Sequence, residues 1–194
     1  TFAYSAKKQR GISGDVYKKI ISRTLKLIFL GLFLAAFTVH FPFFKDLANL
    51  RIPGVLQRIG VVFFISALLF LNFNWKVLLG IFVGILILYW FLLTQIPING
   101  AAPLMTVDSN LPAVIDLNLL TSNHTYKSNY DPEGILSTLP SVATTIFGMF
   151  LGMILLNKSS EPKRKLVRII GIGVIALITG YAWAQFFPLN KALW

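Results

Sequence analysis

Two acids separated by a single proline, Asp131 and Glu133, are the residues of this sequence best placed to do chemistry. They lie in the stretch YDPEGILSTLP at residues 130–140, where a polar segment ends and an uncharged apolar segment begins. Carboxylates at such a boundary accept hydrogen bonds and pair with cations, so they can hold a polar substrate or a basic side chain. The plainer interpretation is a helix start, with Asp131 as the N-cap, Pro132 at the first helical position and Glu133 complementing the helix dipole.

Arg58 is the residue that the helix-cap interpretation leaves unexplained. If an apolar helix begins at Pro53, Arg58 lies about 7 Å below the outer end of that helix. An arginine at this depth in a bilayer needs a partner or a water-filled cavity. We therefore expect Arg58 to lie within salt-bridge range of Asp131 or Glu133, beside an outward-facing polar cavity.

The composition places these groups in a membrane protein. Hydrophobic residues make up 56% of the chain, charged residues make up 13%, and the mean hydropathy is +0.72, which leaves too little polar surface for a soluble protein. The net charge of +11 comes from short basic clusters between apolar segments. Such clusters are typical of loops that face anionic lipid headgroups, so we expect a lipid bilayer and no nucleic acid as partner. The absence of Cys excludes disulfides, thiolate catalysis and Cys-ligated metals.

The apolar segments predict an all-α fold, a polytopic transmembrane helix bundle with about five complete spans. Each segment has about twenty residues, enough to cross a hydrocarbon core of about 30 Å. The expected spans are residues 20–39, 54–73, 77–96, 137–156 and 169–187. Residues 1–6 are expected to be the end of a preceding helix and carry no initiating Met. We therefore expect residues 1–194 to form a single transmembrane domain that is a fragment of a longer multispan protein.

The distribution of charges predicts the orientation in the membrane. Placing residues 7–26, 76 and 158–168 on one side gathers thirteen of the 18 Lys and Arg residues there. The positive-inside rule makes this side cytoplasmic. The long connection at residues 97–134 is then external, and a connection of that length is usually functional or disordered.

The histidines and glycines give weaker signals. His40 and His124 have no second His, Cys or acid at a metal-ligand spacing, so we expect no metal site. A loop histidine is more often solvated or hydrogen-bonded than catalytic. Two spans contain pairs of glycines in a small-xxx-small pattern, Gly80 with Gly84 and Gly148 with Gly152. This pattern indicates close helix packing, and a homodimer through either face stays open.

The segments LRIPGVLQRIG at residues 50–60, YDPEGILSTLP at 130–140 and PLNKALW at 188–194 resemble the heparan-α-glucosaminide N-acetyltransferase family. Its members are multispan membrane proteins that include bacterial relatives of a lysosomal enzyme. The resemblance covers essentially the whole chain, whereas the chain covers only the middle of the family. It implies an integral membrane protein, expected in a bacterial inner membrane, that transfers acetyl from acetyl-CoA to an amino sugar on the non-cytoplasmic side.

The same resemblance assigns no catalytic residue to this chain. The histidine implicated in acetyl transfer in the family is expected upstream of Thr1, and neither His40 nor His124 matches it, so these residues alone are expected to be inactive. Acetyl transfer needs a neutral amine, removal of its proton and a stabilised oxyanion. The roles that the resemblance implies for polar residues are substrate binding by Asp131, Glu133, Arg58 and Lys191, with Arg51 and Gln57 supporting the same cavity.

A transporter is the alternative function, for an amino sugar such as N-acetylglucosamine, because a polar site among membrane helices serves transport equally well. Against it, the sequence has no convincing internal repeat and no broken helices with matched counterparts in two halves. A purely structural membrane module is a third interpretation, and it leaves Arg58 and the long external connection without a purpose.

Overall fold

The computed structural model describes residues 13–38, 43–44, 46–98, 100–103, 105–106, 109–126 and 130–188. Within these residues the chain is helical and contains no β-strand, which confirms the predicted all-α fold. The helices are α2 (Gly14–Ala36), α3 (Val55–Asn72), α4 (Trp75–Gln95), α5 (Leu111–Leu120), α6 (Thr138–Leu156) and α7 (Pro162–Trp183). Two short 3-10 turns, η1 (Leu47–Asn49) and η2 (Ser122–His124), lie in the connections.

Four of these helices, α3, α4, α6 and α7, are long and apolar enough to cross a membrane. The predicted first span corresponds to α2, which has 23 residues but carries Lys18, Lys19, Arg23 and Lys26 between its start and its middle turn. The helix therefore has the length of a span and a basic N-terminal part. Lys and Arg side chains near a helix end can extend along the helix and place their charges at the membrane surface.

The helix ends differ from the predicted spans at α2 and α7, which begin before residues 20 and 169. Asp15 lies in the first turn of α2, where a negative charge is favourable, and Pro162 begins α7 without losing a hydrogen bond. The apolar segment marks the part of each helix that fits the membrane, whereas the helix itself continues through the charged residues. The predicted spans at residues 54–73, 77–96 and 137–156 match α3, α4 and α6 within two residues at each end.

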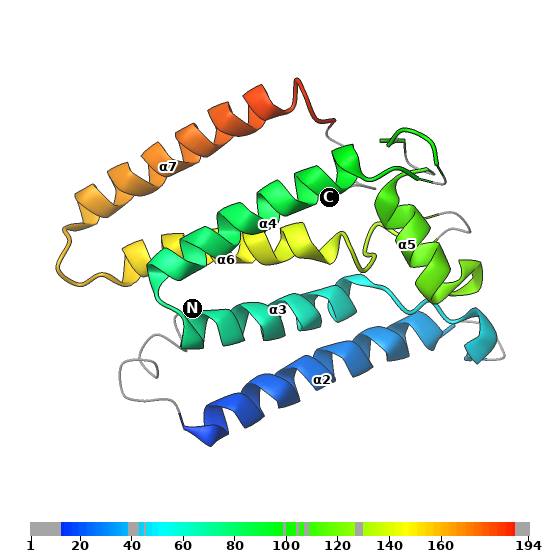
Figure 1. Cartoon of the computed structure of the whole chain (residues 1–194). Helices are drawn as coiled ribbons and strands as arrows, with labels where there is room; N and C mark the ends of the chain where they lie inside the picture. Colours follow the sequence, from blue (N-terminus) through cyan, green and yellow to red (C-terminus); the bar gives the residue numbers. More distant parts are fainter. Residues whose placement is uncertain are drawn as a thin grey trace.

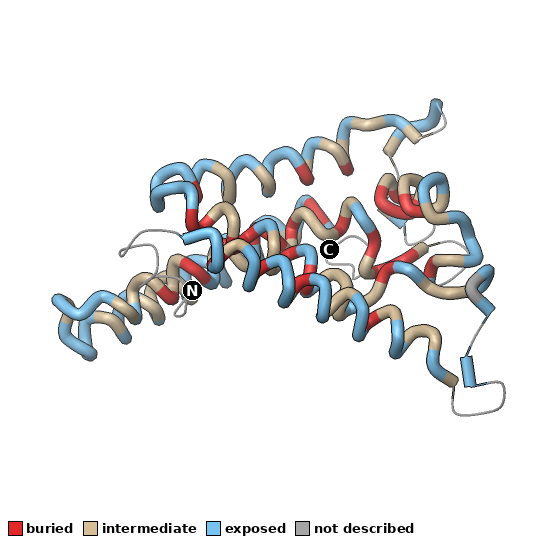
Figure 2. The backbone as a smooth tube through the Cα atoms, turned by 90° about the horizontal axis from the view of Figure 1, so that it is seen from below, coloured by how far each residue is buried: buried red, intermediate tan, exposed pale blue. Residues whose placement is uncertain are grey.

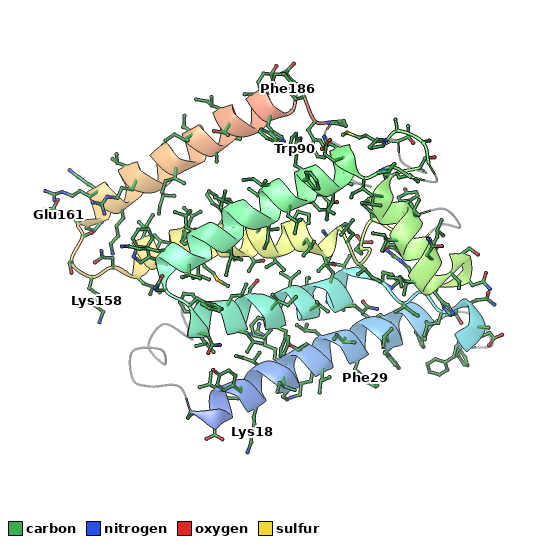
Figure 3. All side chains as sticks on the ribbon, in the orientation of Figure 1. Lys18, Phe29, Trp90, Lys158, Glu161 and Phe186 are labelled. Atoms are coloured by element: carbon green, nitrogen blue, oxygen red, sulfur yellow. The ribbon has the colours of Figure 1, made fainter. Side chains whose placement is uncertain are left out.

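The long helices run side by side, and the connections alternate between the two ends of the bundle (Figure 1). One end holds the start of α2, the α3–α4 connection and the α6–α7 connection. Figure 3 shows Lys18, Lys158 and Glu161 there. The opposite end holds η1, α5, η2 and residues 130–137 (Figure 1). This arrangement agrees with the predicted division of the loops between two sides, while the assignment of each side to a compartment stays a prediction.

The core lies between α3, α4 and α6, where Val62, Leu78, Val142 and Ile146 pack together. Buried positions form interrupted stripes along the helices rather than whole buried helices (Figure 2). Large apolar side chains cover the outer surfaces, among them Phe29, which is 73% exposed. A surface of this kind is expected where helices face lipid.

The Gly80–Gly84 face of α4 is open in the single chain. Both glycines are exposed, and no atom lies within 4 Å of a Cβ built at either position. Gly148 is likewise exposed and open, whereas Gly152 is buried. The glycine pair on α4 therefore does not mediate packing within the described residues, and the homodimer stays a prediction.

Candidate functional site

The long connection at residues 97–134 contains a helix that the sequence prediction missed. Asn110 caps α5 by accepting a hydrogen bond of 2.9 Å from the Ala113 amide, and Pro112 lies in the first turn. An Asn followed closely by a Pro is a recognisable helix-start signal. The apolar sequence LPAVIDLNLL of α5 is too short to span a membrane, and α5 lies at the same end of the bundle as η2 and the start of α6 (Figure 1).

The stretch from Asp131 to Ser137 is a turn that precedes α6, so the interpretation of Asp131 as the N-cap of that helix is wrong. The helix begins at Thr138, and the Asp131 carbonyl accepts a hydrogen bond from the Gly134 amide at 3.2 Å. The Asp131 carboxylate caps the turn itself, because Oδ1 accepts from the Glu133 amide at 2.9 Å. We call residues 131–137 the acidic turn. Its two acids lie ahead of the helix, not in its first turn.

Arg51 holds both acids of the turn. Its guanidinium donates from Nε to Asp131 Oδ2 at 2.9 Å, from Nη2 to Asp131 Oδ1 at 2.7 Å and from Nη2 to Glu133 Oε2 at 2.5 Å. The guanidinium also lies over the ring of Tyr126, with Cζ 4.8 Å from the ring centroid. Burial lowers the pKa of Arg51, but its contacts with Asp131 and then Glu133 outweigh this effect and raise the pKa. Arg51 therefore stays charged, as a bidentate partner of two carboxylates requires.

Asp131 and Glu133 differ in what they leave available. The side chain of Asp131 is fully buried, and its two oxygens accept four hydrogen bonds, two from Arg51, one from the Glu133 amide and one from the Tyr126 amide at 2.7 Å. A carboxylate has about four lone-pair sites, so Asp131 is saturated. The side chain of Glu133 is 12% exposed. Glu133 is therefore the acid of this pair that solvent can reach.

Arg58 does not form the predicted salt bridge. It donates from Nη1 to the Pro132 carbonyl at 2.9 Å, from Nη2 to the Ser137 carbonyl at 2.5 Å, and from Nη2 to Ser141 Oγ. No ion pair within 4.0 Å joins it to Asp131 or Glu133 in the described part of the chain. Arg51 already binds both acids, while the carbonyls of Pro132 and Ser137 lie within hydrogen-bonding distance of the Arg58 guanidinium. Arg58 faces the acidic turn rather than lipid, as expected, but it binds the backbone of that turn.

His124 supports the segment that carries Arg51. Its Nδ1 lies 2.6 Å from the Leu50 carbonyl oxygen, and its own carbonyl accepts a hydrogen bond from the Ile52 amide at 3.0 Å. These two contacts hold the backbone at Leu50 and Ile52, the neighbours of Arg51. Of the two non-catalytic interpretations, solvated or hydrogen-bonded, the structure shows the hydrogen bond.

Asp116 of α5 also contacts the acidic turn, a contact that no sequence pattern predicted. It is fully buried, and Oδ1 accepts a hydrogen bond from the Ile135 amide at 2.8 Å. Burial raises the pKa of Asp116 to about 6, with the Ile135 N–H lowering it and the charge of Asp131 raising it further. An Asp within an apolar ten-residue helix was the available signal, because a buried acid needs a defined partner.

The remaining predicted residues lie apart from this cluster or outside the description. Gln57 is half-buried and points toward Gly31 of α2 and Gly54, where a Cβ at either glycine would collide with its side-chain amide. Lys191 and His40 lie outside the described residues. The part of the chain that the structure describes holds no group of three or more metal-ligating side chains.

The fold and this site define an integral membrane protein of helices, with an arginine-bound pair of carboxylates at one end of the bundle. The family model for "Heparan-alpha-glucosaminide N-acetyltransferase, catalytic" matches residues 1–186, and the chain belongs to this family. The curated relatives include heparan-alpha-glucosaminide N-acetyltransferase of Homo sapiens, 27% identical, and that of Mus musculus, 29% identical, each aligned with 75% of this chain. The chain spans 30% of the length of either relative. The predicted family is confirmed.

Proposed function

We propose that the chain forms the acceptor side of a membrane acetyltransferase, which transfers acetyl from acetyl-CoA to the amino group of an amino sugar on the non-cytoplasmic side. The family match supports acetyl transfer, and the names of the relatives specify a glucosaminide as their acceptor. The observation that carries the proposal is the pair of acids held by Arg51 at the end of the bundle opposite the basic clusters.

Glu133 is the group that binds the acceptor in this proposal. Its partial exposure and its contact with Arg51 through one oxygen, Oε2, suit a carboxylate that receives hydrogen bonds from a sugar hydroxyl or an amine. Asp131 is buried and saturated, so its part is to hold the turn, together with Arg51. Arg58 fixes the same turn by binding the carbonyls of Pro132 and Ser137. Lys191 is proposed to contact anionic groups of the donor.

The reaction joins the amine nitrogen to the thioester carbonyl carbon and breaks the carbon–sulfur bond. The amine loses one proton, and the CoA thiolate leaves and is protonated. An ammonium ion cannot attack, so the acceptor must bind where its proton can be removed. The described residues bind and orient the acceptor in this account.

The test is an acetyl-transfer assay in proteoliposomes with the full-length protein. Labelled acetyl-CoA is enclosed in the vesicles and glucosamine is supplied outside. We expect N-acetylglucosamine to appear with an equal amount of free CoA. Accumulation of unmodified amino sugar inside the vesicles without CoA release would overturn the proposal in favour of a carrier. The carrier is not favoured by the comparisons, because the family and both relatives are named as acetyltransferases.

A further inference from the structure

Asp116 and Gly134 make the closest approach between α5 and the acidic turn. A Cβ built at Gly134 would overlap both carboxylate oxygens of Asp116. Gly134 does not have a left-handed backbone conformation, so the glycine is required here for space rather than for its backbone freedom. The carboxylate fills the place that a side chain at residue 134 would occupy, and the neighbouring amide of Ile135 donates to it.

Burying the Asp116 carboxylate beside Gly134 is unfavourable if the side chain only fills space there. Asp116 is fully buried, its Oδ2 has no hydrogen-bond partner in the described residues, and Asp131 adds a second negative charge nearby. Burying an acid with one oxygen unpaired is unfavourable, so its retention at this contact points to a role in the arrangement of the turn. The charged groups that interact with Asp116 are Asp131 of the acidic turn and, when ionised, Tyr89 of α4.

We propose that Asp116 is a positioning residue for the acceptor: it sets the height and orientation of the acidic turn, and thereby of Glu133, through its contact with Gly134 and Ile135. The proposal rests on the acceptor role of Glu133 given above. Asp116 itself does not touch the acceptor. It acts through the backbone of residues 134 and 135, which follow Glu133 directly.

A double-mutant cycle between the two residues tests this contact. Gly134→Ala introduces the Cβ that collides with the carboxylate, and Asp116→Ala removes the carboxylate that it would meet. We expect each single variant to raise the KM for the amino sugar at least about tenfold, with the KM for acetyl-CoA unchanged. In the double variant the collision is absent. Its rise in KM, relative to the unchanged protein, should therefore be at least about fivefold smaller than the product of the two single rises, since the effects of residues in contact are not additive.

Conservative and distant variants serve as controls. Asp116→Asn keeps an oxygen that can accept the hydrogen bond from the Ile135 amide, so the acceptor KM should stay within about threefold of that of the unchanged protein. Gly180→Ala on α7, where no atom lies within 4 Å of the added Cβ, should have no effect. A merely structural role lowers the amount of active protein and hence the apparent kcat for both substrates, without selectively raising the acceptor KM.

Hydrogen exchange at the Ile135 amide supplies a readout that does not depend on activity. We expect Asp116→Ala to speed this exchange at least about tenfold and Asp116→Asn to leave it largely protected. Strictly multiplicative effects in the cycle, or equal exchange in both Asp116 variants, would overturn the proposal. If Gly134→Ala does not fold, the comparison of Asp116→Ala with Asp116→Asn decides alone. Loss of acetyl transfer in every form, with the exchange pattern as expected, would contradict the acetyltransferase function and leave the contact intact.

Discussion

The guanidinium of Arg51 and the carboxylate of Asp131 form a two-point hydrogen-bonded pair, 2.9 Å and 2.7 Å, across 80 residues of sequence. The pair joins the segment before α3 to the acidic turn before α6. Asp131 is buried to 1% exposure, so its charge depends on this arginine and on two backbone amides. The position of Glu133 follows from the same arginine, which donates to both acids.

Replacing Arg51 by Ala should remove acceptor binding and destabilise the protein. Breaking a buried ion pair typically costs about 3 kcal/mol or more, because one charge is left unpaired. Arg51→Lys should not restore activity, since an ammonium group cannot bind two carboxylates in a planar, bidentate way. The measurements are acceptor KM and thermal unfolding in detergent. Arg164→Lys, in an exposed pair with Glu161, is the matched control and should behave like the unchanged protein. Full activity of Arg51→Lys would contradict the bidentate role.

Arg58→Ala should loosen the acidic turn without removing its ion pairs. The carbonyls of Pro132 and Ser137 then lose their hydrogen bonds from Arg58, worth about 1.5–3 kcal/mol each as bonds to a charged group, whereas Pro132 keeps the bond from the Ser137 hydroxyl at 3.3 Å. We expect faster hydrogen exchange across residues 133–138 and a lower unfolding temperature. Ser141→Ala removes a single partner of Arg58 and should have a clearly smaller effect. Equal effects of the two variants would show that the carbonyl contacts do not hold the turn.

The titration of Asp116 should make stability depend on pH. The pKa of Asp116 is raised to about 6 in the folded state, mainly by burial, whereas the pKa of an Asp in an unfolded chain is about 4. Between about pH 4 and 6 the folded state therefore retains a proton that the unfolded state releases, and the free energy of unfolding falls as pH rises through this window.

Asp116→Asn removes that titration and provides the measurement. The unfolding temperature of this variant minus that of the unchanged protein should be higher at pH 7 than at pH 4.5. Asp15→Asn, at an exposed position in α2, controls for loss of one negative charge. A difference that stays constant between the two pH values would exclude Asp116 as the titrating group.

His124→Phe should weaken acceptor binding through Arg51. The ring contact with the Leu50 carbonyl is lost, while the backbone hydrogen bond from the Ile52 amide can remain. We expect a several-fold rise in acceptor KM, corresponding to about 1 kcal/mol, with kcat changed less than twofold. Steady-state kinetics with varied amino sugar give this value. A complete loss of kcat would instead assign the histidine to the chemical step.

The membrane helices could be predicted from the sequence because an apolar segment of about twenty residues has few alternatives. The ends of α2 and α7 could not, since charged residues continue a helix beyond the membrane. Helix α5 was missed because its ten residues match neither a span nor a polar loop. The sequence pattern thus predicts the membrane helices well, but it does not predict the helix in the connection at residues 97–134.

The members of the site could be predicted better than their pairing. Asp131, Glu133, Arg51 and Arg58 do meet at one end of the bundle, but the predicted partner of the acids was Arg58, whereas Arg51 binds them. Depth in the membrane identifies a residue that needs a partner without showing which one it finds. Asp116 was overlooked because its partner is a backbone amide, which no side-chain pattern reveals.

The acceptor kinetics of Glu133→Gln, compared with Glu161→Gln, test the central claim most directly. Glu161 is exposed at the opposite end of the bundle, so its replacement controls for the loss of one carboxylate. Loss of a charge-assisted hydrogen bond to the acceptor should raise the amino-sugar KM of Glu133→Gln about tenfold to a hundredfold, with the acetyl-CoA KM unchanged. Amino-sugar and acetyl-CoA kinetics of Glu133→Gln that match those of Glu161→Gln would contradict an acceptor site at the acidic turn.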